Sequence, residues 1–310
     1  MFRTTVVWGL AALLVVACII LVIIVSTKRF QDYNTWVFAR RVGLQINSEA
    51  TFNALRRRSN VTSIGGLAGV FVGILVAAAA LLTNPQPGLV SYFWTAAVPI
   101  ILGFTLAGEL VAALRETLFT RDTTLPRFAR SRATGPADYV SRRRRMVAAA
   151  LLAVATVTNA AAVALGVSGS IDAAVYFGSA ALPLLAVGAV ACVGGIVAER
   201  LVLRTPQPAA DPAELAWSDA FVAETLRSIR MTVAVVIWIS VASAGVGLLA
   251  GVDAMHGTSW STDLGPLLFT WGYLALIIVF STRGAQQYYL RRLWPQVLSG
   301  TPAPVRAVQS

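Results

Sequence analysis

Two acidic residues inside long apolar stretches are the first candidates for chemistry. Glu109 and Glu199 each fall near the end of such a stretch, and Arg115 and Arg200 follow closely enough to pair with them. An ionisable group at membrane depth indicates a functional site by default, because burying it is costly. Ion pairs at the membrane interface are the simpler interpretation, and Glu109, the deeper residue, is the more interesting candidate.

Uncharged polar residues in the same stretches could line a path for a neutral solute. The candidate cavity-lining residues are Asn159, Thr105 and Thr270, together with Glu109. Asn159 is the costliest of these to leave unpaired, so we expect its side chain to face other helices. Hydrogen bonding between helices is the alternative account of the three uncharged residues.

The sequence lacks the patterns of known catalytic centres, since no HExxH, GxSxG or P-loop spacing occurs. The single histidine, His256, and the two cysteines, Cys18 and Cys192, supply neither a metal-ligand spacing nor a disulfide framework. The only lysine, Lys28, precludes a retinal Schiff base in the last apolar stretch. We therefore expect no enzyme, no catalytic residue, and no metal or cofactor site.

The composition indicates an integral membrane protein. Of the 310 residues, 57% are apolar and 13% are charged, and the mean hydropathy is +0.71. Soluble domains have about 45–50% apolar and about 25% charged residues. These figures exclude a soluble enzyme, a disordered protein and a secreted disulfide-rich scaffold.

Seven apolar stretches are long enough to cross a bilayer. About 20 residues at about 1.5 Å each match the hydrocarbon core, and without water each stretch must be helical. The predicted spans are Val6–Val25, Ile64–Leu82, Tyr92–Leu114, Met146–Val167, Ala173–Val197, Met231–Gly251 and Gly265–Ser281. The sequence thus predicts an all-α fold with seven transmembrane helices.

Basic residues gather on one side of these spans. The segments after the first, third, fifth and seventh spans hold 24 of the 25 Lys and Arg residues, and the other side holds only Arg3. The positive-inside rule places the N-terminus outside and the C-terminus in the cytoplasm, and a bacterial cytoplasmic membrane is expected. Arg56–Arg58 and Arg142–Arg145 adjoin spans, so they are expected to contact anionic inner-leaflet lipids and not nucleic acid.

Three helical hairpins repeat along the chain after the first span. Each contains a basic cluster, a span, a short outer loop and a second span with a proline: Pro99, Pro183 and Pro266. Parallel repeats predict a pseudo-threefold bundle with the first span at its periphery and a short cytoplasmic amphipathic helix before each hairpin. The prolines either open an outward cavity or only shape the packing.

The repeats divide the chain into five segments. These are the N-terminal helix (1–27), an amphipathic segment with the first hairpin (28–120), a basic linker with the second hairpin (121–204), a linker with the third hairpin (205–292) and a cytoplasmic tail (293–310). Gly65, Gly69 and Gly73 form a small-residue stripe that allows close helix packing, either within the protein or in a homo-oligomer.

Two functions fit these features. One is a transporter, or a membrane subunit of a transport system, for a neutral or lipophilic solute. The repeats, the matched prolines and the sparse midplane charge favour it. The other is a non-catalytic scaffold or accessory subunit that binds other membrane proteins through the glycine stripe and the basic inner face.

Overall fold

The structure, a computed structural model, describes residues 2–46, 48–83, 96–119, 135–205, 212–282, 284 and 287–298. Helices form almost all of this part of the chain, and no strand occurs in it. The helices are α1 (Phe2–Ser26), α2 (Lys28–Val42), α3 (Glu49–Thr83), α5 (Val98–Phe119), α6 (Pro136–Tyr139), α7 (Arg142–Val167), α8 (Ala173–Phe177), α9 (Ala181–Arg204), α10 (Pro212–His256), α11 (Trp260–Ser281), α13 (Tyr288–Leu293) and α14 (Pro295–Leu298).

Six helical stretches in the described residues are long and apolar enough to cross a membrane, and the chain is therefore an all-α polytopic membrane protein. They are Glu49–Leu82, Val98–Phe119, Arg142–Val167, Ala173–Arg204, Pro212–His256 and Trp260–Ser281. The first predicted span falls in α1, whose apolar stretch Val15–Ser26 is shorter. The count of seven therefore stays a prediction.

Several predicted features fall on parts of the chain that the structure leaves undescribed. Most of the first outer loop and the first residues of the third predicted span fall within residues 84–95. The linkers fall largely within residues 120–134 and 206–211, and most of the tail follows residue 298.

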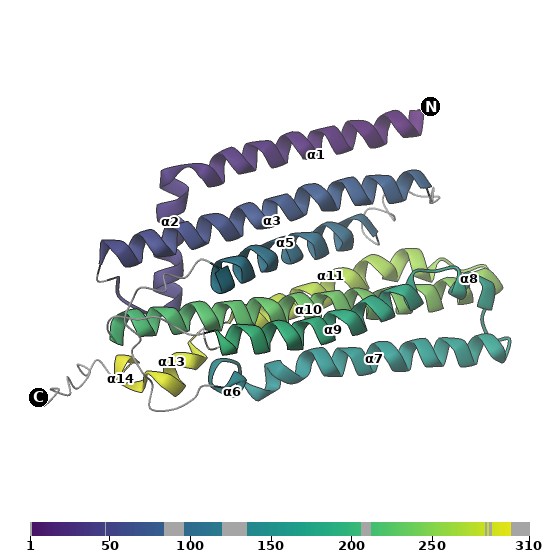
Figure 1. The fold of residues 1–310 in the computed structure, drawn as a ribbon. Helices are drawn as coiled ribbons and strands as arrows, with labels where there is room; N and C mark the ends of the chain where they lie inside the picture. The colour runs from purple at the N-terminus through teal and green to yellow at the C-terminus, as the bar shows by residue number, and fades with distance from the viewer. Residues whose placement is uncertain are drawn as a thin grey trace, which may run out of the picture.

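The long helices run side by side, and α2 crosses them at one end of the molecule (Figure 1). At that end lie the first turns of α3, α7 and α10 and the last turns of α5, α9 and α11. Many of the described arginines lie on the halves of the helices toward this end, and we call it the basic end; they include Arg40, Arg41, Arg56–Arg58, Arg142–Arg145, Arg200 and Arg204. The arrangement agrees with the alternation predicted from the sequence, but the side of the membrane that the basic end faces stays a prediction.

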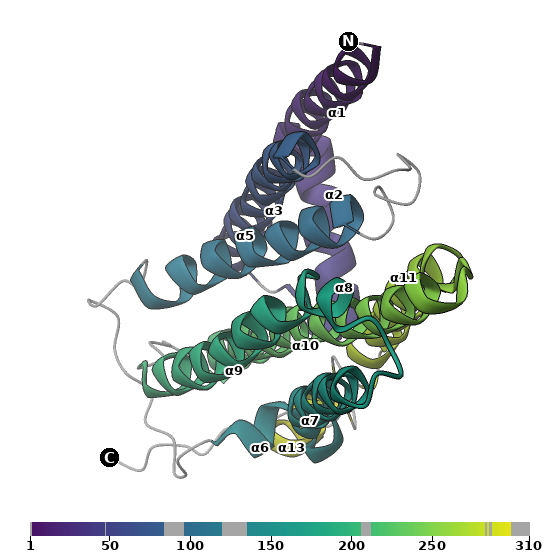
Figure 2. The ribbon, with the colours of Figure 1, turned by 90° about the vertical axis from the view of Figure 1, so that its right-hand side faces the viewer.

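The helices form two groups that meet along one boundary. The N-terminal group contains α1, α2, α3 and α5, and the C-terminal group contains the helices from α6 to α14. Across the boundary, α5 packs on α10 and on α9. The view along the helices shows α3 and α5 on one side of this boundary and α9, α10 and α11 on the other (Figure 2).

The central helix of the C-terminal group is α10. It is 45 residues long and packs against α5, α7, α8, α9 and α11. Half of its most apolar 18 residues are buried, compared with 11–28% in the other five spans. The corresponding helix of the first hairpin, α3, packs on α5, α1 and α2 instead. This asymmetry does not support the pseudo-threefold bundle, and the repeat itself stays a prediction.

The prediction of short amphipathic helices before the first and third hairpins is wrong. Both α3, from Glu49, and α10, from Pro212, continue unbroken into the predicted spans. The arginines at the two junctions are good helix formers, so nothing in the local sequence stops the helix there. The amphipathic helix at the basic end is α2, which lies one element earlier in the chain.

The three repeat prolines occupy different positions in their helices. Pro183 is the third residue of α9, where the missing N–H costs no hydrogen bond. Pro99 is the second residue of α5 and follows Ala96 and Ala97, which are π-helical. Pro266 is the seventh residue of α11 and removes an intrahelical hydrogen bond. The match in depth stays a prediction.

The glycine stripe of α3 packs this helix directly on α5. A Cβ on Gly73 would stand 2.7 Å from Ile101 Cα, and one on Gly69 would stand closer still to the carbonyl oxygen of Phe104. Gly65 leaves equally little room. Close approach of two backbones is the usual role of such stripes in membranes. Here the contact lies within one chain.

Gly69→Ala is expected to lower the free energy of unfolding by about 1–3 kcal/mol, because the added methyl group overpacks the α3–α5 contact. Thermal unfolding of the purified protein in detergent measures the change. Gly194→Ala is the matched control, since a Cβ at Gly194 meets nothing within 4 Å. Equal unfolding temperatures for the two variants would contradict the close packing of α3 on α5.

Candidate functional site

Glu109 lines a polar pocket between α3, α5 and α10. The pocket has a volume of about 190 Å³ and includes hydroxyl groups from Ser59, Thr62, Ser63, Thr225 and Ser228. The half-buried Glu109 forms no hydrogen bond or ion pair within the described part of the chain, so the predicted pairing with Arg115 is not found. Gly66 leaves room for this carboxylate, since a Cβ there would stand 2.8 Å from Glu109 Cγ.

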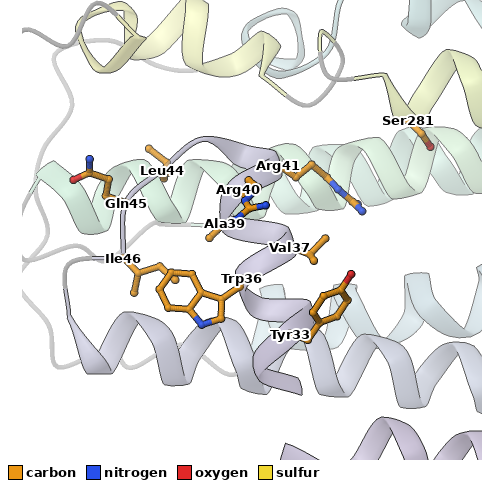
Figure 3. Close-up of a pocket in the computed structure, with 10 residues that line it drawn as sticks. All are labelled: Tyr33, Trp36, Val37, Ala39, Arg40, Arg41, Leu44, Gln45, Ile46 and Ser281. Atoms are coloured by element: carbon orange, nitrogen blue, oxygen red, sulfur yellow. The ribbon is translucent and has the colours of Figure 1, made fainter. Parts of the chain in front are cut away.

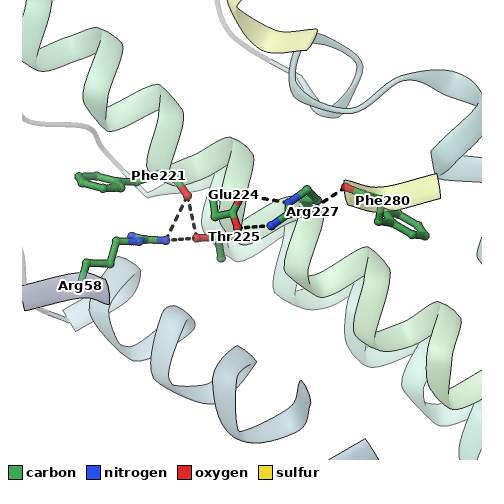
Figure 4. A network of polar contacts seen from close by, with 6 residues as sticks. All are labelled: Arg58, Phe221, Glu224, Thr225, Arg227 and Phe280. Carbon is green, nitrogen blue, oxygen red and sulfur yellow. Dashed lines mark hydrogen bonds and ion pairs between the residues drawn. The ribbon is translucent and has the colours of Figure 1, made fainter. Parts of the chain in front are cut away.

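Arg58, another lining residue of this pocket, links the two helix groups. Its guanidinium donates to Thr225 Oγ1 at 2.6 Å and to the carbonyl oxygen of Phe221 at 3.2 Å, and it lies 4.6 Å from the centroid of the Phe221 ring. Thr117 on α5 accepts a further hydrogen bond from Arg58 at 3.3 Å. Figure 4 shows Arg58 reaching from α3 to α10. Burial of this arginine is thus compensated by protein groups.

An ion pair on α10 provides a second charged contact beside the pocket. Arg227 and Glu224 lie one turn apart, with Arg227 Nε 2.9 Å from Glu224 Oε2. Arg227 also donates to the carbonyl oxygen of Phe280 at 3.1 Å, where α11 ends (Figure 4). Both members of the pair lie within electrostatic range of Glu109. The Glu109 carboxylate therefore faces one repulsive and one attractive charge, neither bonded to it.

An apolar pocket lies between α5, α10 and α11. Its volume is about 200 Å³, and its walls include Leu102, Trp238 and Phe269. Thr270 lines this pocket, as predicted for a cavity residue, although the surrounding wall is apolar. Tyr273 also lines it and lies within electrostatic range of Glu109.

The two pockets lie on the same faces of α5 and α10. Leu102 and Glu109 are seven residues apart on α5, as are Ser228 and Val235 on α10. Seven residues make about two helical turns, so each pair shares one side of its helix. We call this line of contact the α5–α10 seam. Between the pockets Thr232 donates to the carbonyl oxygen of Leu106 at 3.5 Å, so a single helical turn separates them.

Asn159 and Thr105 line neither of these pockets. Asn159 is buried and accepts a hydrogen bond from the Tyr176 hydroxyl at 2.7 Å, while its amide donates to the carbonyl oxygen of Ala155 at 2.7 Å. Thr105 donates to the carbonyl oxygen of Ile101 in its own helix at 2.7 Å. The interhelical account therefore fits Asn159, whose partner lies in the short helix α8.

Glu199 has the ion pair that the sequence suggests, but with a different arginine. Its partner is Arg230 of α10, whereas Arg200 is exposed. Arg230 also donates to the carbonyl oxygen of Arg145 at 3.2 Å, so it joins α10 to both α9 and α7. The sequence indicated the acidic residue, but its cationic partner lies on another helix and could not be found from spacing.

The two arginine clusters predicted to contact lipids bind protein groups to a large extent. Arg56 donates to Gln31 Oε1 at 2.9 Å, and Arg144 donates to the carbonyl oxygen of Val279 at 3.0 Å. Arg58 reaches into the bundle, as described above. Arg57, Arg142 and Arg143 are the exposed members, and for them the lipid contact stays a prediction.

Asp219 forms a cluster at the basic end that the sequence did not reveal. Its buried carboxylate accepts hydrogen bonds from the Tyr139 hydroxyl at 2.8 Å and from Trp294 Nε1 at 2.9 Å. Burial, together with the charges of Asp219 and Glu224, raises the pKa of Tyr289 above its ordinary range. In the sequence Asp219 resembles an ordinary acidic residue in the first turn of a helix. Its partners, Tyr139 and Trp294, lie far away in the sequence, so spacing could not identify the cluster.

Tyr176→Phe is expected to lower the free energy of unfolding by about 1–3 kcal/mol, because it leaves the buried Asn159 oxygen without a donor. Asn159→Leu should destabilise for the same reason, by leaving the Tyr176 hydroxyl unpaired. The double variant should lose less than the sum of the two single variants. A double-mutant cycle from unfolding in detergent measures this coupling, and additive losses would rule out the hydrogen bond as the cause.

The described residues thus place one unpaired carboxylate in a polar pocket and align that pocket with an apolar one along the α5–α10 seam. A group of three or more His, Cys, Asp or Glu side chains that could hold a metal ion is not found among the described residues. Comparison of the chain with protein-family models, with curated proteins and with solved structures finds no match.

Proposed function

We propose that this protein is a transporter, or the membrane subunit of a transport system, for a lipophilic solute with a small neutral or cationic head. The observation that carries the proposal is the Glu109 pocket, because an unpaired carboxylate beside hydroxyl groups is costly to keep in a membrane and marks solute or ion pathways. The head occupies the polar pocket, and the apolar part lies against Leu102, Trp238 and Phe269.

The position of the seam supports transport over simple binding. Transporters hold their solute where two helix groups meet and expose it alternately to each side as one group moves against the other. The seam lies between two such groups. Only the contact between Leu106 and Thr232 separates the two pockets. A small movement of α5 relative to α10 could therefore join or separate the two pockets.

The charge distribution gives the orientation of the protein in the membrane. In this proposal the basic end faces the cytoplasm of a bacterial cell, as the positive-inside rule requires. The polar pocket, which lies nearer that end, then opens toward the cytoplasmic side of the seam, and the apolar pocket lies toward the outer side.

A membrane scaffold is the second candidate, and α9 is the element that favours it. Only 11% of its most apolar 18 residues are buried, and Val190 and Val193 are exposed. Gly194 on the same helix has no neighbouring atoms within reach of a Cβ. A partner helix could approach closely at such a surface. A scaffold, however, has no use for an unpaired Glu109.

Cysteine accessibility distinguishes the two functions. In a background with Cys18 and Cys192 replaced by alanine, Ser63→Cys and Thr270→Cys place one thiol in each pocket. Vesicles of both orientations are treated with a membrane-impermeant maleimide. A transporter exposes the seam alternately, so each thiol should react in both orientations, and more slowly at the far side.

The control for this experiment is Thr156→Cys, at an exposed position on α7 outside both pockets. Its thiol faces lipid and should stay unmodified. Reaction of neither pocket thiol from the side opposite the basic end would overturn the transport proposal and leave the scaffold.

Glu109 itself should react with a hydrophobic carbodiimide, which modifies protonated carboxyl groups in apolar surroundings. Mass spectrometry of the Glu109 peptide measures the modification, and Glu116, which pairs with Arg57 at 3.5 Å, is the internal control. Decylamine should slow the reaction and decanoate should not, because Glu109 and Glu224 repel an anionic head. Equal protection by both compounds would contradict the proposed solute class.

A further inference from the structure

A large groove lies on α2 at the basic end. Its volume is about 980 Å³, and α2 contributes most of its lining, with additions from the segment that follows α2 and from Ser281 at the end of α11. Figure 3 shows Tyr33, Val37 and Arg41 on the flank of α2 that faces Ser281, and Trp36 on the other flank beside Ile46. The groove shares no lining residue with either seam pocket.

The outer face of α2 is amphipathic in an unusual way. Among Tyr33, Trp36, Val37, Arg40 and Arg41, each residue has another three or four positions away, so the set covers one broad side of the helix between its two flanks. The opposite side, with Thr35, Ala39 and Val42, is buried against the bundle. Tyr33 and Trp36 are nevertheless 67% and 59% exposed. The exposed side therefore combines aromatic rings with two arginines.

Arg40 and Arg41 differ from the arginines that bind groups within the bundle. Arg56, Arg58, Arg144, Arg227 and Arg230 all donate to protein groups. The guanidinium groups of Arg40 and Arg41 are exposed and form no hydrogen bond or ion pair with any described residue. The α2 helix carries four basic residues and one acid, Asp32, whose carboxylate lies 3.4 Å from Arg56. The groove is thus positively charged without an internal counter-charge.

The position of α2 defines what can neutralise this charge. The helix crosses the long helices where the membrane-spanning segments end (Figure 1). Tyrosine and tryptophan concentrate at this depth, and helices that combine them with arginine lie in the interface among lipid headgroups. Anionic headgroups of the inner leaflet attract such basic residues.

We propose that the groove on α2 binds the headgroup of an anionic phospholipid. The phosphate is held between Arg40 and Arg41, which present the N–H groups that phosphate oxygens accept. The Ser281 hydroxyl lies on the same side, and the acyl chains extend over Tyr33 and Val37 along the end of α11. A bound lipid would connect α2 of the N-terminal group with α11 of the C-terminal group.

The test uses the full chain, purified in detergent and freed of endogenous lipid. Binding of phosphatidylglycerol, phosphatidylcholine and glycerol phosphate is measured by native mass spectrometry. Phosphatidylglycerol should bind in preference to phosphatidylcholine, and glycerol phosphate should not bind at comparable concentration, because it lacks the chains that contact Tyr33 and Val37. Equal binding of both lipids, or strong binding of glycerol phosphate, would overturn the proposal.

Two double variants locate the site. Arg40→Gln with Arg41→Gln should weaken phosphatidylglycerol binding about tenfold or more, as expected for the loss of charge-assisted hydrogen bonds. Arg200→Gln with Arg204→Gln removes the same charge from exposed positions on α9 and should leave the binding within about twofold. Equal weakening in both variants would indicate a general charge effect and sink the proposed site.

A third variant separates binding from stability. Arg40→Lys with Arg41→Lys keeps the charge on α2 and should restore most of the affinity that the glutamine variant loses. All variants must elute as single species with the same unfolding temperature in lipid-free detergent, which is expected because both arginines are exposed. Failure of the lysine variant to recover any affinity would count against a phosphate contact.

Discussion

The pairing of charges around α10 is the interaction on which the rest of the structure depends. A helix that is central in a membrane protein can carry charged residues only where partners compensate for the lost water. Arg227 reaches the last carbonyl groups of α11, and Arg230 joins α9 and α7. Arg58 supplies the corresponding link from α3. These contacts define the places at which α3, α7, α9 and α11 meet α10.

Glu109 departs from this pattern, and the departure gives the seam its functional meaning. Its neighbours Glu224 and Arg227 are already bonded to each other, and Arg58 is held by Thr225, Thr117 and the Phe221 backbone. The Glu109 carboxylate therefore faces the pocket and charged groups that already have hydrogen-bond partners of their own. Such a residue destabilises the resting protein, so a role in binding is the economical explanation for its presence.

Periodicity and composition predict the parts of this fold that depend on one helix at a time. Local sequence is enough to predict the six apolar helical stretches and the position of Glu109 within one of them. It also predicts the close packing at Gly65, Gly69 and Gly73. Contacts between distant segments could not be predicted in this way. The partner of Asn159 could not be identified from the sequence, because Tyr176 belongs to a short helix that the predicted span Ala173–Val197 merges with α9. Likewise, the expected interfacial segments before the first and third hairpins are the first parts of α3 and α10, because helix propensity continues through their arginines.

The links between the two helix groups have an uneven distribution along the molecule. The described hydrogen bonds between the groups lie in the half of the molecule nearer the basic end, or at the middle of the molecule. They involve Arg58, Thr117, Thr232, Trp217 and Gln287. Bodies joined at one end rotate about that end, so the displacement of one group against the other grows with distance from α2. The largest change in the width of the seam would thus occur far from its carboxylate, and Glu109 would lie close to the axis of rotation. In the proposed transporter, a residue in that position would keep nearly constant surroundings while the far end of the seam changes most in width.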